Sequence, residues 1–168
     1  MNKNKELDTD VEIFENVVKI NRVNKVVKGG KRLAFRAFVI CGDKKGNVGI
    51  GLGKSKEVPT AIKKAIEKAK RNFIFINTLD ETIPHVVEGK YGASRVIIKP
   101  AKKGTGVIAG GALRVILESL GIKNVVGKSI QSRNPLNLAL ASLDALKKCK
   151  VKSQEELERG VQITTSYS

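Results

Sequence analysis

One short segment constrains the fold more than any other part of the chain. Between Val48 and Gly53, the apolar residues Val48, Ile50 and Leu52 alternate with three glycines. A period of two is that of a β-strand, so one face of this strand is apolar and the other is bare backbone. A bare face lets another backbone approach closely, and RNA is the partner that we expect there.

A helix is predicted directly after this strand. Apolar residues recur at helical spacing from Val58 to Phe73, and Pro59 falls in the first turn, where its missing N–H costs little. Two further strands precede the glycine-rich one, because Val17–Val27 and Leu33–Cys41 are rich in β-branched and apolar residues. The sequence therefore predicts a first unit of three strands and one helix.

The later half of the chain predicts a second unit of mixed strands and helices. Gly121 closes one predicted helix, and Asn134-Pro135 is a favourable start for the next. The predicted elements are strands at Thr82–Val87, Arg95–Ala101 and Asn124–Ile130, helices at Ala112–Leu120 and Pro135–Leu146, and a short helix at Glu155–Arg159.

The predicted fold class is thus α+β, with two small units in tandem and no internal repeat. We expect residues 1–11 to form a flexible tail, 12–77 the first unit, 78–150 the second unit, and 151–168 a polar tail.

The charge balance points to a polyanionic partner. The 168 residues include 32 Lys and Arg against 16 Asp and Glu, a net charge of +16. From Lys19 to Arg71 there are 16 basic and three acidic residues. A compact chain with this excess repels itself, so a polyanion such as RNA is the expected ligand.

Composition also argues against other classes of protein. The two cysteines are far apart and form no metal-binding motif, so we expect a reduced, cytoplasmic chain without a metal site. The start is polar and no stretch approaches the length of a membrane span, so no membrane association is expected. With 4% aromatic residues, a stacking surface for single strands is absent, which favours folded RNA recognised through its backbone.

Three features suggest an enzyme, but none of them is accompanied by the residues that the corresponding reaction or ligand would need. A phosphate-binding loop needs G-x-x-x-x-G-K-[ST], but Val48 stands where the first glycine of a motif ending in Lys54-Ser55 should be. The cluster Gly104–Gly111 opens a helix and is either an anion site or a tight turn, and both interpretations stay open. A kinase-like second unit remains a formal alternative, although no motif supplies an acidic magnesium ligand. His85 has no catalytic partner by motif.

The candidate RNA-binding residues are mainly basic residues and the glycines between them. Glycines at the tip of a charged loop, with few acidic residues nearby, favour insertion against phosphates. The predicted set is Arg22, Lys25, Lys28, Gly29, Gly30, Lys31, Arg32, Arg36, Gly51, Lys54, Lys56, Lys102, Lys103 and Arg133.

Two stretches resemble a known family. Val23–Asn72 closely resembles the amino-terminal domain of bacterial small-subunit ribosomal protein number five, and Gly104–Asn137 resembles its carboxy-terminal domain. The resemblance implies a double-stranded-RNA-binding-like first unit without its first helix. It also implies a β-α-β-α second unit with a left-handed crossover. It implies a ribosomal, non-enzymatic protein with no cofactor and no small-molecule substrate.

The resemblance also implies partners and sites. The expected partners are small-subunit rRNA, ribosomal proteins number four and number eight, and mRNA near the channel through which it enters. The loop matching Lys25–Arg32 would reach toward the head–body hinge, where family changes give spectinomycin resistance. Gly106 and Arg114 would lie at the contact with protein number four, where changes affect decoding fidelity. The alternative function is a free RNA-binding regulator or ribosome maturation factor.

Overall fold

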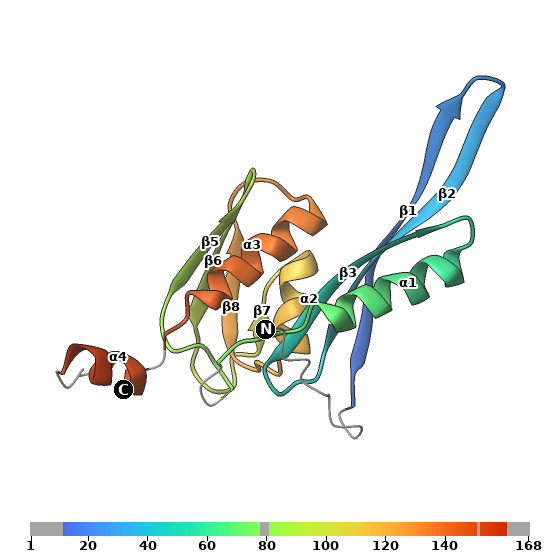
Figure 1. Cartoon of the computed structure of the whole chain (residues 1–168). Helices are drawn as coiled ribbons and strands as arrows, with labels where there is room; N and C mark the ends of the chain where they lie inside the picture. Colours follow the sequence, from blue (N-terminus) through green and yellow to red (C-terminus); the bar gives the residue numbers. More distant parts are fainter. Residues whose placement is uncertain (1–11, 78–80, 151, 161–168) are drawn as a thin grey trace.

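The computed structural model describes residues 12–77, 81–150 and 152–160 (Figure 1). The predictions for residues 1–11 and 161–168 lie outside the described residues. A first antiparallel sheet has the order β1-β2-β3-β4, and a second has the order β5-β6-β8-β7. This arrangement confirms the α+β class and the two units in tandem.

The first sheet is dominated by a long hairpin. Helix α1 lies against one face of the sheet, and the hairpin of β1 and β2 extends beyond the helix (Figure 1). The elements of this unit are β1 (Phe14–Val27), β2 (Gly30–Gly42), β3 (Asn47–Ser55), α1 (Val58–Arg71) and β4 (Ile74–Phe75).

The tip of the hairpin is tighter than predicted. The sequence suggested a charged loop from Lys28 to Arg32, but β1 and β2 stay paired until Val27 faces Gly30. Only two residues make the turn, and one of them, Gly29, has φ of 93°, a conformation that favours glycine. Because only two residues form the connection, the ladder continues through residues that looked like a loop.

The second sheet combines antiparallel pairs with one parallel pair. Strands β7 and β8 are parallel, and α2 connects them, which gives the β-α-β arrangement expected from the resemblance. The elements are β5 (Val87–Tyr91), β6 (Ser94–Pro100), β7 (Val107–Ile108), α2 (Gly111–Ser119), β8 (Val125–Ser129), α3 (Pro135–Lys147) and α4 (Lys152–Arg159).

The strand predicted at Thr82–Val87 is wrong. The strand is β5, which begins at Val87. Pro84 has no N–H for a ladder, and the Thr82 hydroxyl donates instead to the carbonyl oxygen of Asn124. Strands β4 and β7 were not predicted, because two residues are too few to show a period.

The two units share one hydrophobic core. The face of the first sheet that points away from α1 contributes Phe38, Ile40 and Val48 to the cluster that contains the buried side chains of α2 and α3. A smaller second cluster lies between α1 and the other face of the sheet. Its buried members are Ala37, Val39, Cys41, Ala61, Ala65 and Ala69.

The turn between β2 and β3 joins the units directly. The Lys44 N–H donates to the carbonyl oxygen of Ser119 at the end of α2, with the two atoms 3.0 Å apart. Asp43 shapes this turn by accepting hydrogen bonds from the backbone N–H groups of Lys45 and Asn47. Burial raises the pKa of Asp43, but the hydrogen bonds from the Asn47 side chain and these N–H groups outweigh it and lower the pKa overall.

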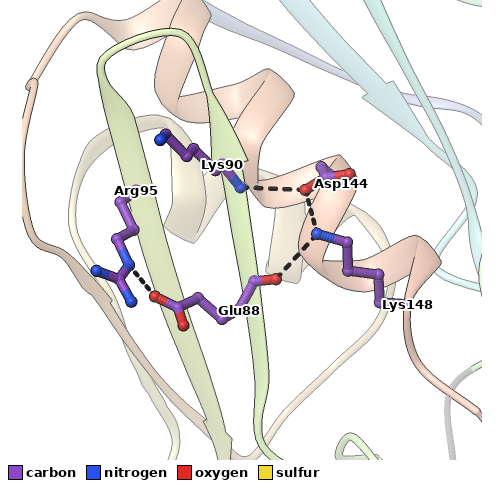
Figure 2. Close-up of polar contacts among 5 residues, drawn as sticks. All are labelled: Glu88, Lys90, Arg95, Asp144 and Lys148. Carbon is purple, nitrogen blue, oxygen red and sulfur yellow. Dashed lines mark hydrogen bonds and ion pairs between the residues drawn. The ribbon is translucent and has the colours of Figure 1, made fainter.

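Asp144 of α3 and Lys148, which directly follows the helix, lie along the outer edge of β5, as Figure 2 shows. Asp144 Oδ2 accepts from the backbone N–H of Lys90 at 3.1 Å, and Lys148 Nζ donates to the carbonyl oxygen of Glu88 at 3.3 Å. Asp144 and Lys148 also pair with each other, and Arg95 pairs with the Glu88 side chain. The hydrogen bonds from Lys148 and from the Lys90 N–H lower the pKa of Asp144.

Candidate nucleic-acid interface

Strand register gathers part of the predicted basic cluster onto one surface. Residues that face each other in an antiparallel pair point to the same side of the sheet. Lys25 faces Arg32, and Arg36 faces Lys54 on the next strand. These positions share a side with Phe38 and therefore point away from α1. We define the cationic hairpin face as Lys19, Lys25, Arg32, Arg36 and Lys54.

The cationic hairpin face carries charge that no neighbour neutralises. All five side chains are exposed. Within the described part of the chain, none of them forms an ion pair with Asp or Glu. Exposed cations that are held on paired strands and are not matched by carboxylates suit the phosphates of RNA, which need charge more than base-specific contacts.

The sequence prediction divides over two faces of the hairpin. Arg22 and Lys31 lie on the opposite side from the cationic hairpin face, together with Val26 and Leu33, which are 70% and 47% exposed. Period-two alternation along β1 could have separated the two sets, but only once the register with β2 was known. Lys19 belongs to the cationic hairpin face and was missing from the predicted RNA-binding residues.

The remaining members of the predicted set in this unit lie at the hairpin tip and before α1. Lys28, Gly29 and Gly30 are exposed at the tip, and Lys56 is exposed between β3 and α1. A Cβ at Gly29 or Gly30 would meet no atom within 4 Å, so the tip has open space around it.

The prediction that RNA approaches the β3 glycines is wrong, and Gly51 leaves the RNA-binding set. A Cβ at Gly49, Gly51 or Gly53 would lie 2.1, 1.9 or 2.0 Å from a backbone oxygen of α1. The backbone that comes close is therefore that of the chain's own helix, which rests directly on the bare strand. Because this segment is a strand, it also cannot wrap a nucleotide phosphate.

The glycine cluster of the second unit begins with a tight turn. The backbone N–H groups of Gly104 and Gly106 both donate to Asn124 Oδ1, at 2.9 and 3.2 Å. These N–H groups are thus already used, which favours the tight-turn interpretation over an anion site at this point. Asn124 is buried, and its role carried no signal in the sequence.

The predicted RNA-binding positions of the second unit lie on loops outside the hairpin. Lys102 and Lys103 are exposed in the loop between β6 and β7. Arg133, after β8, lines a hollow at the start of α2. Arg114 lies on α2 and pairs with Glu118, with Nε and Oε1 2.7 Å apart. Gly106 has φ of 76° and open space around its Cβ position.

The described residues offer little for catalysis. Among them, no group of three or more His, Cys, Asp and Glu side chains is placed to hold a metal ion. Burial raises the pKa of both thiols, Cys41 and Cys149, to about 11, so they are protonated and unreactive at neutral pH. In the same part of the chain, no helix is long and apolar enough to cross a bilayer.

Comparisons with known proteins agree with this geometry. Residues 13–77 match the family described as "Ribosomal protein S5, N-terminal domain", and residues 89–159 match "Ribosomal protein S5, C-terminal domain". The chain is 50% identical over 161 residues to "Small ribosomal subunit protein uS5c" of Rhodomonas salina, covering 95% of each chain. It is 52% identical over 136 residues to "Small ribosomal subunit protein uS5" of Thermotoga maritima, covering 81% of this chain and 76% of that one. The chain therefore belongs to the ribosomal protein S5 family.

Proposed function

We propose that this chain binds rRNA phosphates with its cationic hairpin face. It does so as a structural and non-enzymatic constituent of the small ribosomal subunit. The observation that carries the proposal is the set of five exposed cations without carboxylate partners on that face. The pairing of β1 with β2 sets the spacing of four of these charges, so ordering them against a folded RNA surface costs less backbone entropy than ordering a loop.

The dependence of rRNA binding on salt tests this proposal. Each phosphate contact releases a counterion, so log affinity falls linearly with log salt concentration. Replacing Lys25 and Arg32 with Gln should lower the magnitude of that slope by about 2. Replacing the exposed Lys90 and Lys99 of the second unit with Gln is the control and should leave the slope nearly unchanged.

A slope that is the same for both double variants would contradict the proposal. Cosedimentation of the chain with small subunits in a lysate would separate a constituent of the ribosome from a free RNA-binding regulator.

The finer parts of the function also belong to this proposal. We infer that the hairpin tip supports the head–body hinge, and that the chain lies near the channel through which mRNA enters and beside ribosomal proteins number four and number eight. Gly106 and Arg114 are the proposed contact with protein number four and support decoding fidelity. The open space around Gly106 supports this assignment, because a partner can approach its backbone there.

Gly106→Arg tests the fidelity assignment. A large side chain should crowd the proposed interface and raise misreading of near-cognate codons. Gly104→Arg is the matched control, because Gly104 also has positive φ and open space and donates to the same Asn124 oxygen. Equal misreading in both variants, with each incorporated into subunits, would remove Gly106 from the interface.

A further inference from the structure

A hollow lies between the two units, on the face of the first sheet that points away from α1. Its volume is about 560 Å³, and side chains of β3 and α3 form most of its wall. The aliphatic residues that line it are Ile50, Leu52, Ile74, Leu136, Leu140 and Leu143. A wall of this composition favours apolar side chains as its ligand.

The edge of β3 beside the hollow is open. Strand β4 pairs with only the first two residues of β3, so among the described residues no strand covers Gly49–Ser55 on that side. The Asn47 carbonyl oxygen accepts from the Asp43 N–H on the β2 side, and backbone groups alternate in direction along a strand. The backbone N–H and C=O groups of Ile50 and Leu52 therefore point outward at this edge.

Two lysines of α1 flank the open edge. Lys68 extends from α1 past the edge of β3 and lines the hollow, and Lys64 stands one turn earlier on the same side of the helix. Both side chains are exposed, and within the described ranges neither forms an ion pair with Asp or Glu. The edge thus has an apolar surface on one side and unmatched positive charge on the other.

These three features together specify the chemistry of one kind of ligand. A strand added to β3 would present alternate side chains to the two faces of the sheet. Residues on the side of Ile50 and Leu52 would enter the hollow, and the residues between them would lie beside Lys64 and Lys68. An extended peptide that alternates apolar with acidic residues satisfies all three features. RNA does not, because its backbone has no row of amide donors and carbonyl acceptors to pair with a strand.

We propose that the open edge of β3 is a docking site for an extended segment of another protein, in which apolar and acidic residues alternate. Main-chain hydrogen bonds to β3 supply affinity, and the hollow and the lysines select the sequence. The chain itself occupies backbone groups of the β5 edge with Asp144 and Lys148, but leaves the β3 edge available. The site shares no residue with the cationic hairpin face, so loss of one leaves the other intact.

Binding of a synthetic peptide to the full chain tests the proposal. The probe is a fluorescent peptide of about eight residues, the length of a typical strand, that alternates glutamate with valine and leucine. The control peptide has the same composition, with its glutamates grouped at one end. Fluorescence anisotropy should show binding of the alternating peptide and about tenfold weaker binding of the grouped one, which cannot present one apolar side.

Hydrogen exchange measured by NMR reports whether the peptide adds as a strand. The amide protons of Ile50 and Leu52 should become protected from exchange when the alternating peptide binds. Those of Gly49 and Gly51 point toward β2 and should not change. Binding without new protection of Ile50 and Leu52 would overturn strand addition.

Exchange of charge tests the lysines. Lys64→Glu with Lys68→Glu should weaken binding of the alternating peptide about tenfold or more, and a peptide with lysine in place of glutamate should bind this variant better than it binds the unaltered chain. Lys63→Glu with Lys99→Glu, at exposed positions away from the edge, is the matched control and should leave binding nearly unchanged. Leu140→Gln tests the hollow and should weaken binding about tenfold. Circular dichroism verifies that each variant is folded.

Equal binding of the two peptides, or a charge exchange that does not restore binding, overturns the proposal. Three further results overturn it by assigning the edge to another occupant. Protection of the Ile50 and Leu52 amides in the chain alone, lost when residues 161–168 are removed, assigns the edge to the chain's own end. Protection that rises with chain concentration assigns it to a second copy. An A-form RNA duplex that protects the same amides and displaces the peptide assigns it to RNA.

Discussion

Two groups of glycines in this chain differ in what surrounds them. Gly49, Gly51 and Gly53 of β3 lie under α1, where an added Cβ would strike helix backbone. Gly29 and Gly106 lie in turns with positive φ, where an added Cβ would meet no atom within 4 Å. The first group is closed by the chain itself, and the second is open to a partner.

The difference shows how position decides the meaning of glycine. Alternating glycines in a strand followed by an alanine-rich helical stripe indicate close packing within the fold. Glycines in a turn between lysines indicate backbone freedom at a surface. The β3 glycines and Gly29 both suggested contact with RNA in the sequence, and of these only Gly29 remains available for it.

Gly51→Ala should give the largest effect, because it forces α1 away from β3. The new Cβ would lie 1.9 Å from the Ala65 oxygen, and overpacking of this kind lowers the free energy of unfolding by about 3 kcal/mol. Urea unfolding measures this loss. Gly110→Ala is the control, because its φ is ordinary, its Cβ position is open, and the expected change is below about 0.5 kcal/mol. Equal urea unfolding midpoints for the two variants would mean that α1 does not pack directly on the glycines of β3.

Asp43→Ala tests a turn whose conformation is fixed by side-chain hydrogen bonds and not by glycine, at the point where the two units join. It removes an acceptor of several hydrogen bonds and should lower the free energy of unfolding by about 2 kcal/mol at pH 7. The pKa of Asp43 is lowered by folding, so its stabilisation is complete above its unfolded pKa of about 3.9 and is lost as the pH falls through the folded value.

The difference in stability between the unaltered chain and Asp43→Ala should therefore shrink below about pH 4. Unfolding midpoints recorded from pH 7 to pH 3 check this. A difference that grows toward low pH would reverse the assigned role of the carboxylate. Glu67→Ala, on the exposed side of α1, is the control without such hydrogen bonds.

Gly29→Val tests an open glycine. Its side chain has space, but φ of 93° disfavours a β-branched residue, so the expected loss in the free energy of unfolding is about 1–2 kcal/mol and local to the hairpin tip. Binding to rRNA should weaken, because Lys28 and Lys31 move with the tip. Gly29→Asn is the milder control, since Asn tolerates positive φ. Equal stability of Val and Asn variants would mean that the turn adopts another conformation.

Lys54→Ala should have the smallest effect on stability, within about 0.5 kcal/mol, because the side chain is exposed on the cationic hairpin face. The magnitude of the salt slope for rRNA binding should fall by about 1. Salt titrations of binding measure it. A nucleotide-dependent activity that is present in the unaltered chain and lost in this variant would instead support the enzyme alternative.

The sequence predicted long elements well and their partners less well. The stripe of Ala61, Ala65 and Ala69 identified α1 because a helical period over several turns is unambiguous. The same stripe did not reveal that β3 receives the helix, because a period describes one element and not its neighbour. The division of the hairpin cations between two faces depends on the pairing of β1 with β2, which is a non-local property.

Two further features had no local signal. Asn124 organises the Gly104–Gly106 turn from 18 or 20 residues away in the sequence, through hydrogen bonds that only the fold creates. The shift of the strand from Thr82–Val87 to Val87–Tyr91 depends on the edge of β6, which no window of residues contains. Tertiary contacts override local preference in both cases.

The occupied edge of β5 has a consequence for the chain before it meets RNA. An open edge strand is a template on which a second chain can add a strand and begin to aggregate. Asp144 and Lys148 occupy the outward N–H of Lys90 and the outward carbonyl of Glu88, so the chain itself covers part of this template. The outer edge of β1 is protected from strand addition in a different way, because lysines and an arginine lie along the strand. Protection of the β1 edge relies on repulsion between like charges, which salt screens, whereas protection of the β5 edge relies on hydrogen bonds at individual backbone groups.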